Sequence, residues 1–135
     1  KRKAIDWAKA NTDLGDNFLI LDEQGNPLLS PLTEWFPALA ERRSIATIQG
    51  TEWLSEDRHY NEIYSVITDI HQCLYQDVNC LLELHDELPD NYEYIMLSTK
   101  QQNGSNGIAL FTSLNENAEY TLVYTSSNIY IFKAP

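Results

Sequence analysis

Short apolar runs that alternate with helical patterns constrain the fold of this chain most strongly. Asn17–Asp22 is a nearly continuous apolar run between turn signals, as expected of a strand covered on both faces. Residues 44–48 and 92–98 repeat this pattern, with helical segments in between. A strand that returns to the same sheet through a helix forms a right-handed parallel crossover. We therefore predict an α/β, three-layer domain with a mainly parallel sheet, its strands near 17–22, 44–48 and 92–98.

The C-terminal part predicts a different pairing. Residues 120–125 and 129–132 are separated by Ser-Ser-Asn, which favours an antiparallel hairpin added to one edge of the sheet. The longest helix is expected to begin at Ser55, and its inward positions keep helical spacing: Tyr60, Ile63, Tyr64, Ile67, Ile70, His71 and Leu74. His71 is interpreted as a histidine of the core or its boundary. Pro37 predicts two short helical pieces, near 31–36 and 37–41.

The length of 135 residues fits one domain, and the 43% hydrophobic share fits a packed core. The longest apolar runs are far too short to span a bilayer. The chain opens at Lys1-Arg2-Lys3 without an initiator Met, so we expect residues 1–135 to be a single domain of a longer protein.

The formal charge of −11 is unevenly distributed. Residues 1–10 hold four basic residues and one acidic residue, whereas the rest of the chain holds five basic and 19 acidic residues. Such an acidic body repels phosphate backbones, so no nucleic-acid partner is expected. The basic start is interpreted either as a tether beside a membrane or as an ordinary solvated end.

Two cysteines, Cys73 and Cys80, are separated by a segment that resembles a helix end and a turn. On one continuous helix they would lie about 10 Å apart, beyond disulfide reach, but a bend at residues 76–79 would allow a bond. Two buried free thiols are the alternative. A metal site would need His71 and His85, and no Cys-x-x-Cys pair supports it. We predict a disulfide, which indicates an oxidising compartment.

Ligands of open α/β sheets usually bind beyond the carboxyl ends of the parallel strands. By that rule the loops 22–30, 49–55 and 99–107 lie together, and their polar and aromatic members include Glu23. The candidate binding residues are Asp22, Gln49, Glu52, Trp53 and Lys100. Such a rim suits a sugar or a peptide. In the alternative interpretation, Trp53 covers the core and the acidic side chains are solvated.

Motifs for catalysis do not occur. The sequence contains no Gly-x-Ser-x-Gly elbow, no glycine loop for phosphate after the first strand and no His-x-x-x-His pair. We therefore assign no catalytic residue, no metal ligand and no cofactor, and expect this chain itself to catalyse nothing.

Residues 35–39 (Trp-Phe-Pro-Ala-Leu) and 43–53 (Arg-Ser-Ile-Ala-Thr-Ile-Gln-Gly-Thr-Glu-Trp) carry a family resemblance. They resemble the C-terminal extracytoplasmic domain of bacterial multipass membrane glycosyltransferases, the superfamily of protein mannosyltransferases and lipid A aminoarabinose transferases. Residues 5–7, 17–21, 120–124 and 129–132 fit the same pattern.

The resemblance implies a domain outside the bacterial cytoplasmic membrane, attached to an upstream transmembrane region of its own protein. Members of this superfamily move a sugar from a polyprenyl-phosphate carrier to an acceptor, and their catalytic carboxylate lies in a loop that no residue of this chain matches. The domain would cover the membrane active site or bind a glycan, lipid-linked sugar or protein acceptor. The alternatives are a periplasmic or secreted binding module without a transferase, and a small free-standing hydrolase.

Overall fold

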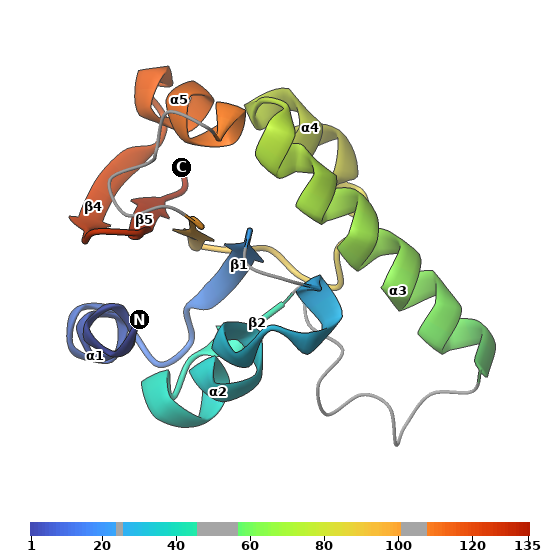
Figure 1. Ribbon diagram of the computed structural model, residues 1–135, viewed down its shortest axis with the longest axis horizontal. Helices are drawn as coiled ribbons and strands as arrows, with labels where there is room; N and C mark the ends of the chain where they lie inside the picture. The colour runs from blue at the N-terminus through green and yellow to red at the C-terminus, as the bar shows by residue number, and fades with distance from the viewer. Residues whose placement is uncertain (24–25, 46–56, 101–107) are drawn as a thin grey trace.

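The structure, a computed structural model, describes residues 1–23, 26–45, 57–100 and 108–135 (Figure 1). The strands are β1 (Asn17–Asp22), β2 (Arg43–Ser44), β3 (Tyr94–Ser98), β4 (Thr121–Thr125) and β5 (Ile129–Lys133). The α-helices are α1 (Arg2–Asn11), α2 (Pro31–Ala40), α3 (Asp57–Gln72), α4 (Val78–Leu84) and α5 (Ala109–Glu116). Short 3-10 helices are η1 (Pro27–Leu29), η2 (Cys73–Tyr75) and η3 (His85–Glu87).

The described strands form one mixed sheet in the order β2-β1-β3-β5-β4. β1 lies parallel to both β2 and β3, whereas β5 lies antiparallel to both β3 and β4. The predicted α/β class and the predicted C-terminal antiparallel hairpin are confirmed. The sheet is mixed and not mainly parallel as predicted, because the hairpin joins the parallel strands directly, through the pairing of β5 with β3.

The strand predicted at 44–48 is described only at its start. β2 covers Arg43 and Ser44, and the backbone N–H of Ile45 donates to the Phe18 carbonyl at 3.0 Å. Parallel pairing with β1 therefore continues to Ile45, and the remaining predicted positions, 46–48, lie outside the described residues.

Successive side chains of β1 point to opposite faces of the sheet and contribute to a buried core on each face. Phe18 and Ile20 belong to one buried cluster, which residues of α1 and α2 complete. Leu19 and Leu21 belong to the other, completed by α3, α4 and α5. Figure 1 shows α1 and α2 on one side of the strands and α3–α5 on the other. Burial on both sides explains why the β1 sequence is continuously apolar.

Helix α2 runs unbroken through Pro37, so the prediction of two helical pieces is wrong. Leu32, Phe36 and Ala40 share one side of this helix and are all buried in the same cluster. We attribute the continuity to this packing, which outweighs the hydrogen bond that Pro37 cannot donate. The helix ends at Glu41, which adopts a left-handed conformation with φ of 56°.

Arg42 is a buried basic residue that joins the ends of two helices. Only 6% of the surface of Arg42 is exposed. The guanidinium donates to the carbonyls of Lys9 at 3.0 Å and Thr12 at the end of α1. It also donates to those of Ala40 at 3.3 Å and Glu41 at 3.0 Å at the end of α2. Helix C-termini leave carbonyls without helical partners and attract positive charge, so Arg42 satisfies both ends at once.

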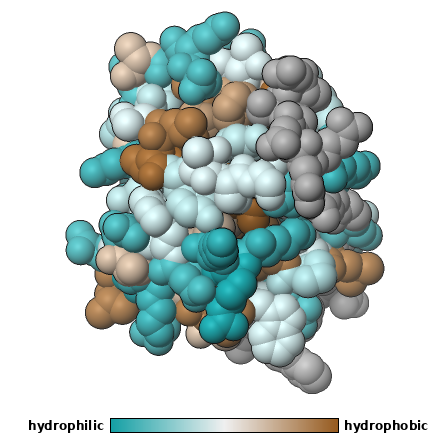
Figure 2. Space-filling view, turned by 60° about the vertical axis from the view of Figure 1, so that its left-hand side comes forward, coloured by the Kyte–Doolittle hydropathy of each residue, from teal (hydrophilic) through white to brown (hydrophobic). Residues whose placement is uncertain are grey.

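Basic residues at the N-terminus form ion pairs, two of which, from Lys1 and Lys9, reach the acidic part of the chain beyond residue 10. Lys1 pairs with Asp22, Arg2 with Asp6, and Lys9 with Glu41. These ion pairs give the basic start a role within the domain, and the membrane-tether interpretation stays a prediction. On the face drawn in Figure 2, hydrophobic residues form small groups separated by hydrophilic ones. Among the described helices, none has both the length and the apolar character needed to cross a bilayer.

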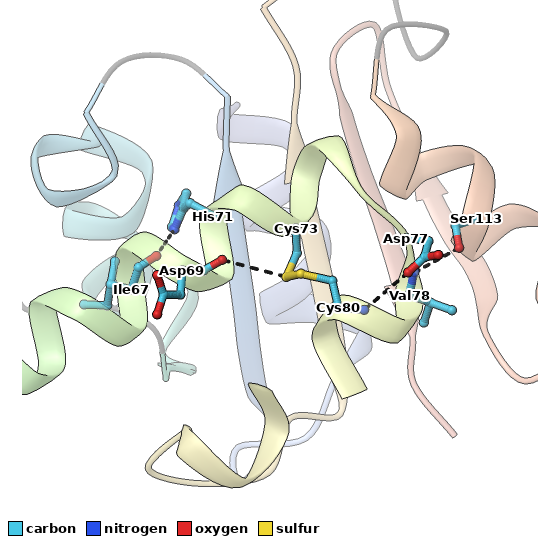
Figure 3. The surroundings of a disulfide bond; sticks show 8 residues. All are labelled: Ile67, Asp69, His71, Cys73, Asp77, Val78, Cys80 and Ser113. Carbon is cyan, nitrogen blue, oxygen red and sulfur yellow. Dashed lines mark hydrogen bonds between the residues drawn. A yellow bond between two sulfur atoms is a disulfide. The ribbon is translucent and has the colours of Figure 1, made fainter. Parts of the chain in front are cut away.

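Cys73 and Cys80 form a disulfide, with Cα atoms 5.5 Å apart (Figure 3). The predicted bend is present, because η2 ends α3 and α4 begins after Asp77, whose side chain accepts a hydrogen bond from the Cys80 N–H at 3.3 Å. The prediction of a disulfide is thus confirmed. The bond uses both sulfur atoms, which excludes the free-thiol and metal interpretations of this pair.

Removing the disulfide is expected to destabilise the fold moderately. The Cys73→Ala/Cys80→Ala double variant should lower the free energy of unfolding by about 2.5 kcal/mol, because the bond closes a short loop in the unfolded chain. Urea denaturation of the oxidised protein and the double variant measures this difference. Reductant should shift the wild-type midpoint and leave that of the double variant in place; equal midpoints for oxidised and reduced wild type would contradict the expectation.

Candidate ligand-binding site

A cavity of about 230 Å³ lies at the carboxyl end of β1, between that strand end and α3. Its walls include Asp22 and Glu23 from the end of β1, and Tyr64, Thr68, His71 and Tyr75 from α3 and η2. The end of a parallel strand is where open α/β sheets usually bind ligands. The cavity is therefore the candidate site in the described part of the chain.

The carboxylate of Asp22 accepts hydrogen bonds at the wall of the cavity. Asp22 is the last residue of β1, and its side chain has no exposed surface. The Ser30 hydroxyl donates to Oδ2 at 2.7 Å, and the Lys1 ammonium lies 3.3 Å from the same oxygen. A buried carboxylate requires such partners. Asp22 thus places a negatively charged acceptor beside the cavity.

His71 is buried, with 6% of its surface exposed. Its Nδ1 lies 2.9 Å from the carbonyl oxygen of Ile67 (Figure 3). Because a carbonyl only accepts, Nδ1 carries the hydrogen. Burial lowers the pKa of His71, against the opposing effects of the Ile67 hydrogen bond and the charge of Asp22. In the neutral ring Nε2 is then an acceptor, and it is buried without a partner in the described residues.

The lowered pKa of His71 predicts that stability falls with acidity. The unfolded chain binds a proton at His71 near the ordinary pKa of 6.5, whereas the folded chain binds it only at lower pH. The contribution of the neutral ring is therefore complete above that value and is lost as the pH falls from there toward the folded pKa. As the pH is lowered from about 8 to about 5, we expect the wild type to lose stability relative to His71→Gln.

Denaturant unfolding of both proteins across that range measures the difference. His85→Gln, at a half-exposed histidine outside the cavity, is the control for loss of a histidine. A pH-independent difference between wild type and His71→Gln would contradict the expectation.

The predicted binding residues lie only partly at this cavity. Asp22 lines it, as the strand-end rule predicted. Lys100 is exposed and does not line it, although its backbone N–H donates to the Glu23 carboxylate at 2.9 Å and so lies close to the end of β1. Gln49, Glu52 and Trp53 lie outside the described residues, and their grouping with Asp22 stays a prediction.

Several lining residues were not predicted as binding residues. They are Asn26, Pro27 and Leu74, and five residues on α3 and η2, namely Tyr64, Thr68, His71, Gln72 and Tyr75. Tyr64 was predicted to face inward, but it is 43% exposed. The five residues on α3 and η2 follow helical spacing in a stripe beside the buried stripe of Ile67, Ile70 and Leu74. That neighbouring polar and aromatic stripe is the available signal in the sequence. The predicted inward positions include only Tyr64 and His71 of this stripe, because the two stripes differ by one position of the helix, and no role is predicted for Thr68, Gln72 and Tyr75.

The site combines hydrogen-bond acceptors with aromatic side chains. Carboxylates come from Asp22 and Glu23, and a neutral acceptor from Nε2 of His71. Tyr64 and Tyr75 are both partly exposed at the same cavity. Within residues 1–23, 26–45, 57–100 and 108–135, no three His, Cys, Asp or Glu side chains gather as a metal site. The arrangement suits a ligand that donates hydrogen bonds and has an apolar face.

The chain matches no protein-family model, and no curated protein matches it.

Proposed function

We propose that the chain is a three-layer α/β domain of a polyprenyl-phosphate-sugar-dependent membrane glycosyltransferase, in which it binds the acceptor on the extracytoplasmic side and catalyses nothing itself. The observation that carries this proposal is the cavity at the carboxyl end of β1, lined by carboxylates, a neutral histidine acceptor and tyrosines. The resemblance of residues 35–39 and 43–53 supports the assignment to the transferase superfamily.

The charge of the cavity favours the acceptor over the lipid-linked donor. Asp22 and Glu23 line it, and the chain as a whole carries a formal charge of −11. A phosphate group near these carboxylates would be repelled. A sugar hydroxyl donates hydrogen bonds to carboxylates and to a neutral imidazole. Of the two roles open to this domain, binding of an acceptor therefore fits better than contact with the polyprenyl phosphate.

The Cys73–Cys80 disulfide supports an extracytoplasmic location. Disulfides persist in oxidising compartments and are rare in the cytosol of most cells. The bond also links η2, which contributes to the cavity, to α4. An oxidising location would thus keep one wall of the candidate site anchored.

The complete gene product tests the proposal. In fractionated bacterial cells it should sediment with the membrane, with Cys73 and Cys80 oxidised and this domain accessible to protease added outside spheroplasts. A cytosolic product with reduced cysteines would refute the proposal.

The second candidate function is a periplasmic or secreted binding module without a transferase, which the same cavity and disulfide support. Release of the whole product by osmotic shock, with no membrane-bound fraction, would establish this alternative in place of the transferase.

A further inference from the structure

We infer that the cavity at the end of β1 is a subsite for a single neutral sugar ring, one hydroxyl of which donates a hydrogen bond to Nε2 of His71. The inference rests on the proposed function and names the ligand of the same site. It follows from three properties of the cavity, namely its unsatisfied acceptor, its charge and its size.

The unsatisfied acceptor is the strongest of these. His71 is more than nine-tenths buried, and its Nδ1 is occupied by the Ile67 carbonyl. Nε2 is left with a lone pair and no partner in the described residues. Buried polar atoms are nearly always hydrogen-bonded, and those that are not point to a missing partner. His71 lines the cavity, so a ligand hydroxyl placed there would supply that hydrogen bond.

The charge of the cavity disfavours an anionic ligand. The carboxylates of Asp22 and Glu23 line the same cavity. Lys1 forms an ion pair with Asp22. The Oε2 atom of Glu23 accepts a hydrogen bond from the backbone N–H of Lys100, and this donor does not neutralise the charge of the carboxylate. An anionic ligand would be repelled by this wall, whereas sugar hydroxyls would donate to it.

Size and aromatic lining fit one ring. The cavity of about 230 Å³ is smaller than the roughly 300–1,000 Å³ of sites for drug-sized molecules, and far larger than the roughly 30 Å³ share of one water. Tyr75 lines the cavity and is 55% exposed, so aromatic surface is accessible to a ligand. A sugar ring has an apolar face for a tyrosine and a polar rim for His71.

Nitrogen NMR of the folded chain with ¹⁵N-labelled histidine tests the inference. The probes are the methyl glycosides of glucose, mannose and N-acetylglucosamine, with glucose 6-phosphate as the anionic counterpart. At least one neutral probe should shift the Nε2 resonance of His71 saturably, with a Kd on the order of 1 mM for so small a ligand. His85, outside the cavity, should not shift. The phosphorylated sugar should bind at least about tenfold more weakly.

Amino-acid substitutions test which residues bind the probe. His71→Leu should weaken binding at least about tenfold, and His85→Leu is the matched control that should leave it unchanged. Tyr75→Ala, at an exposed residue whose loss leaves the core intact, should also weaken binding and decides the question if His71→Leu does not fold.

Absence of a His71 shift with every neutral probe, equal shifts at both histidines, or tighter binding of the phosphorylated sugar would overturn the inference. Failure of these tests together with a membrane-bound, oxidised gene product would leave a transferase domain that covers the membrane site. Failure of the fractionation test would instead refute the transferase assignment, whatever the probes bind.

Discussion

Replacing Arg42 by Met is expected to lower the free energy of unfolding by about 3–5 kcal/mol, one of the two largest single-residue effects we predict. Met retains most of the apolar stem but removes the guanidinium that donates to the ends of α1 and α2. The carbonyls of these ends would lose their charged partner in a largely buried place, and a buried acceptor without a partner is costly. Urea denaturation of wild type and variant measures the loss.

Arg43 provides a matched control in the next position. Its guanidinium is exposed and pairs at 2.7 Å with Asp90, which is also exposed. Exposed ion pairs contribute little, so Arg43→Met should change the free energy of unfolding by at most about 1 kcal/mol. Arg42→Lys should recover only part of the stability, because an ammonium lacks the planar fork that reaches several carbonyls. Similar losses for Arg42→Met and Arg43→Met would contradict the assigned role of Arg42.

Replacing Phe18 by Ala is expected to lower the free energy of unfolding by about 3–5 kcal/mol, the value typical of an aromatic ring removed from a core. Phe18 has no exposed surface and lies in β1. Its ring centroid is 4.9 Å from that of Phe36 in α2 and 5.0 Å from that of Tyr94 in β3. The truncation would leave a cavity between the sheet and α2, which thermal and urea denaturation would both detect.

Trp35 is the aromatic control for Phe18. It lies in the same helix as Phe36 but is 56% exposed. Trp35→Ala should therefore change the free energy of unfolding by no more than about 0.5 kcal/mol. A larger loss from Trp35→Ala than from Phe18→Ala would contradict the placement of the core between β1 and α2.

Strands buried on both faces could be predicted, because their continuous apolar sequences are compatible with few other structures. Asn17–Asp22 was predicted with the bounds that β1 has in the structure, since a continuous apolar run must be covered on both sides. The pairing of β5 with β3 was not predicted, because hairpin patterns carry no information about which edge receives them. Helix α2 was predicted to break at Pro37, and the packing of Phe36 and Ala40 on the sheet overrides that local signal.

Only those residues of the candidate site whose position follows from the sheet topology could be predicted. Asp22 followed from its place at the carboxyl end of a parallel strand. His71 and Tyr64 were assigned to the core or its boundary, because helical periodicity places a residue on a side of the helix without saying whether that side meets a core or a cavity. His71 is indeed buried, yet its ring has one satisfied nitrogen and one that is not. That difference depends on tertiary structure and leaves no mark in the sequence.

Steady-state transfer by the complete gene product tests the central claim most directly. Membrane vesicles that contain either wild type or His71→Leu would be supplied with a polyprenyl-phosphate-linked sugar and increasing concentrations of acceptor. If this domain binds the acceptor, the variant should raise the KM for the acceptor at least about tenfold while kcat and the KM for the donor stay unchanged. Transfer with an unaltered KM for the acceptor, in a variant that is folded and present in the membrane at the wild-type level, would contradict the account.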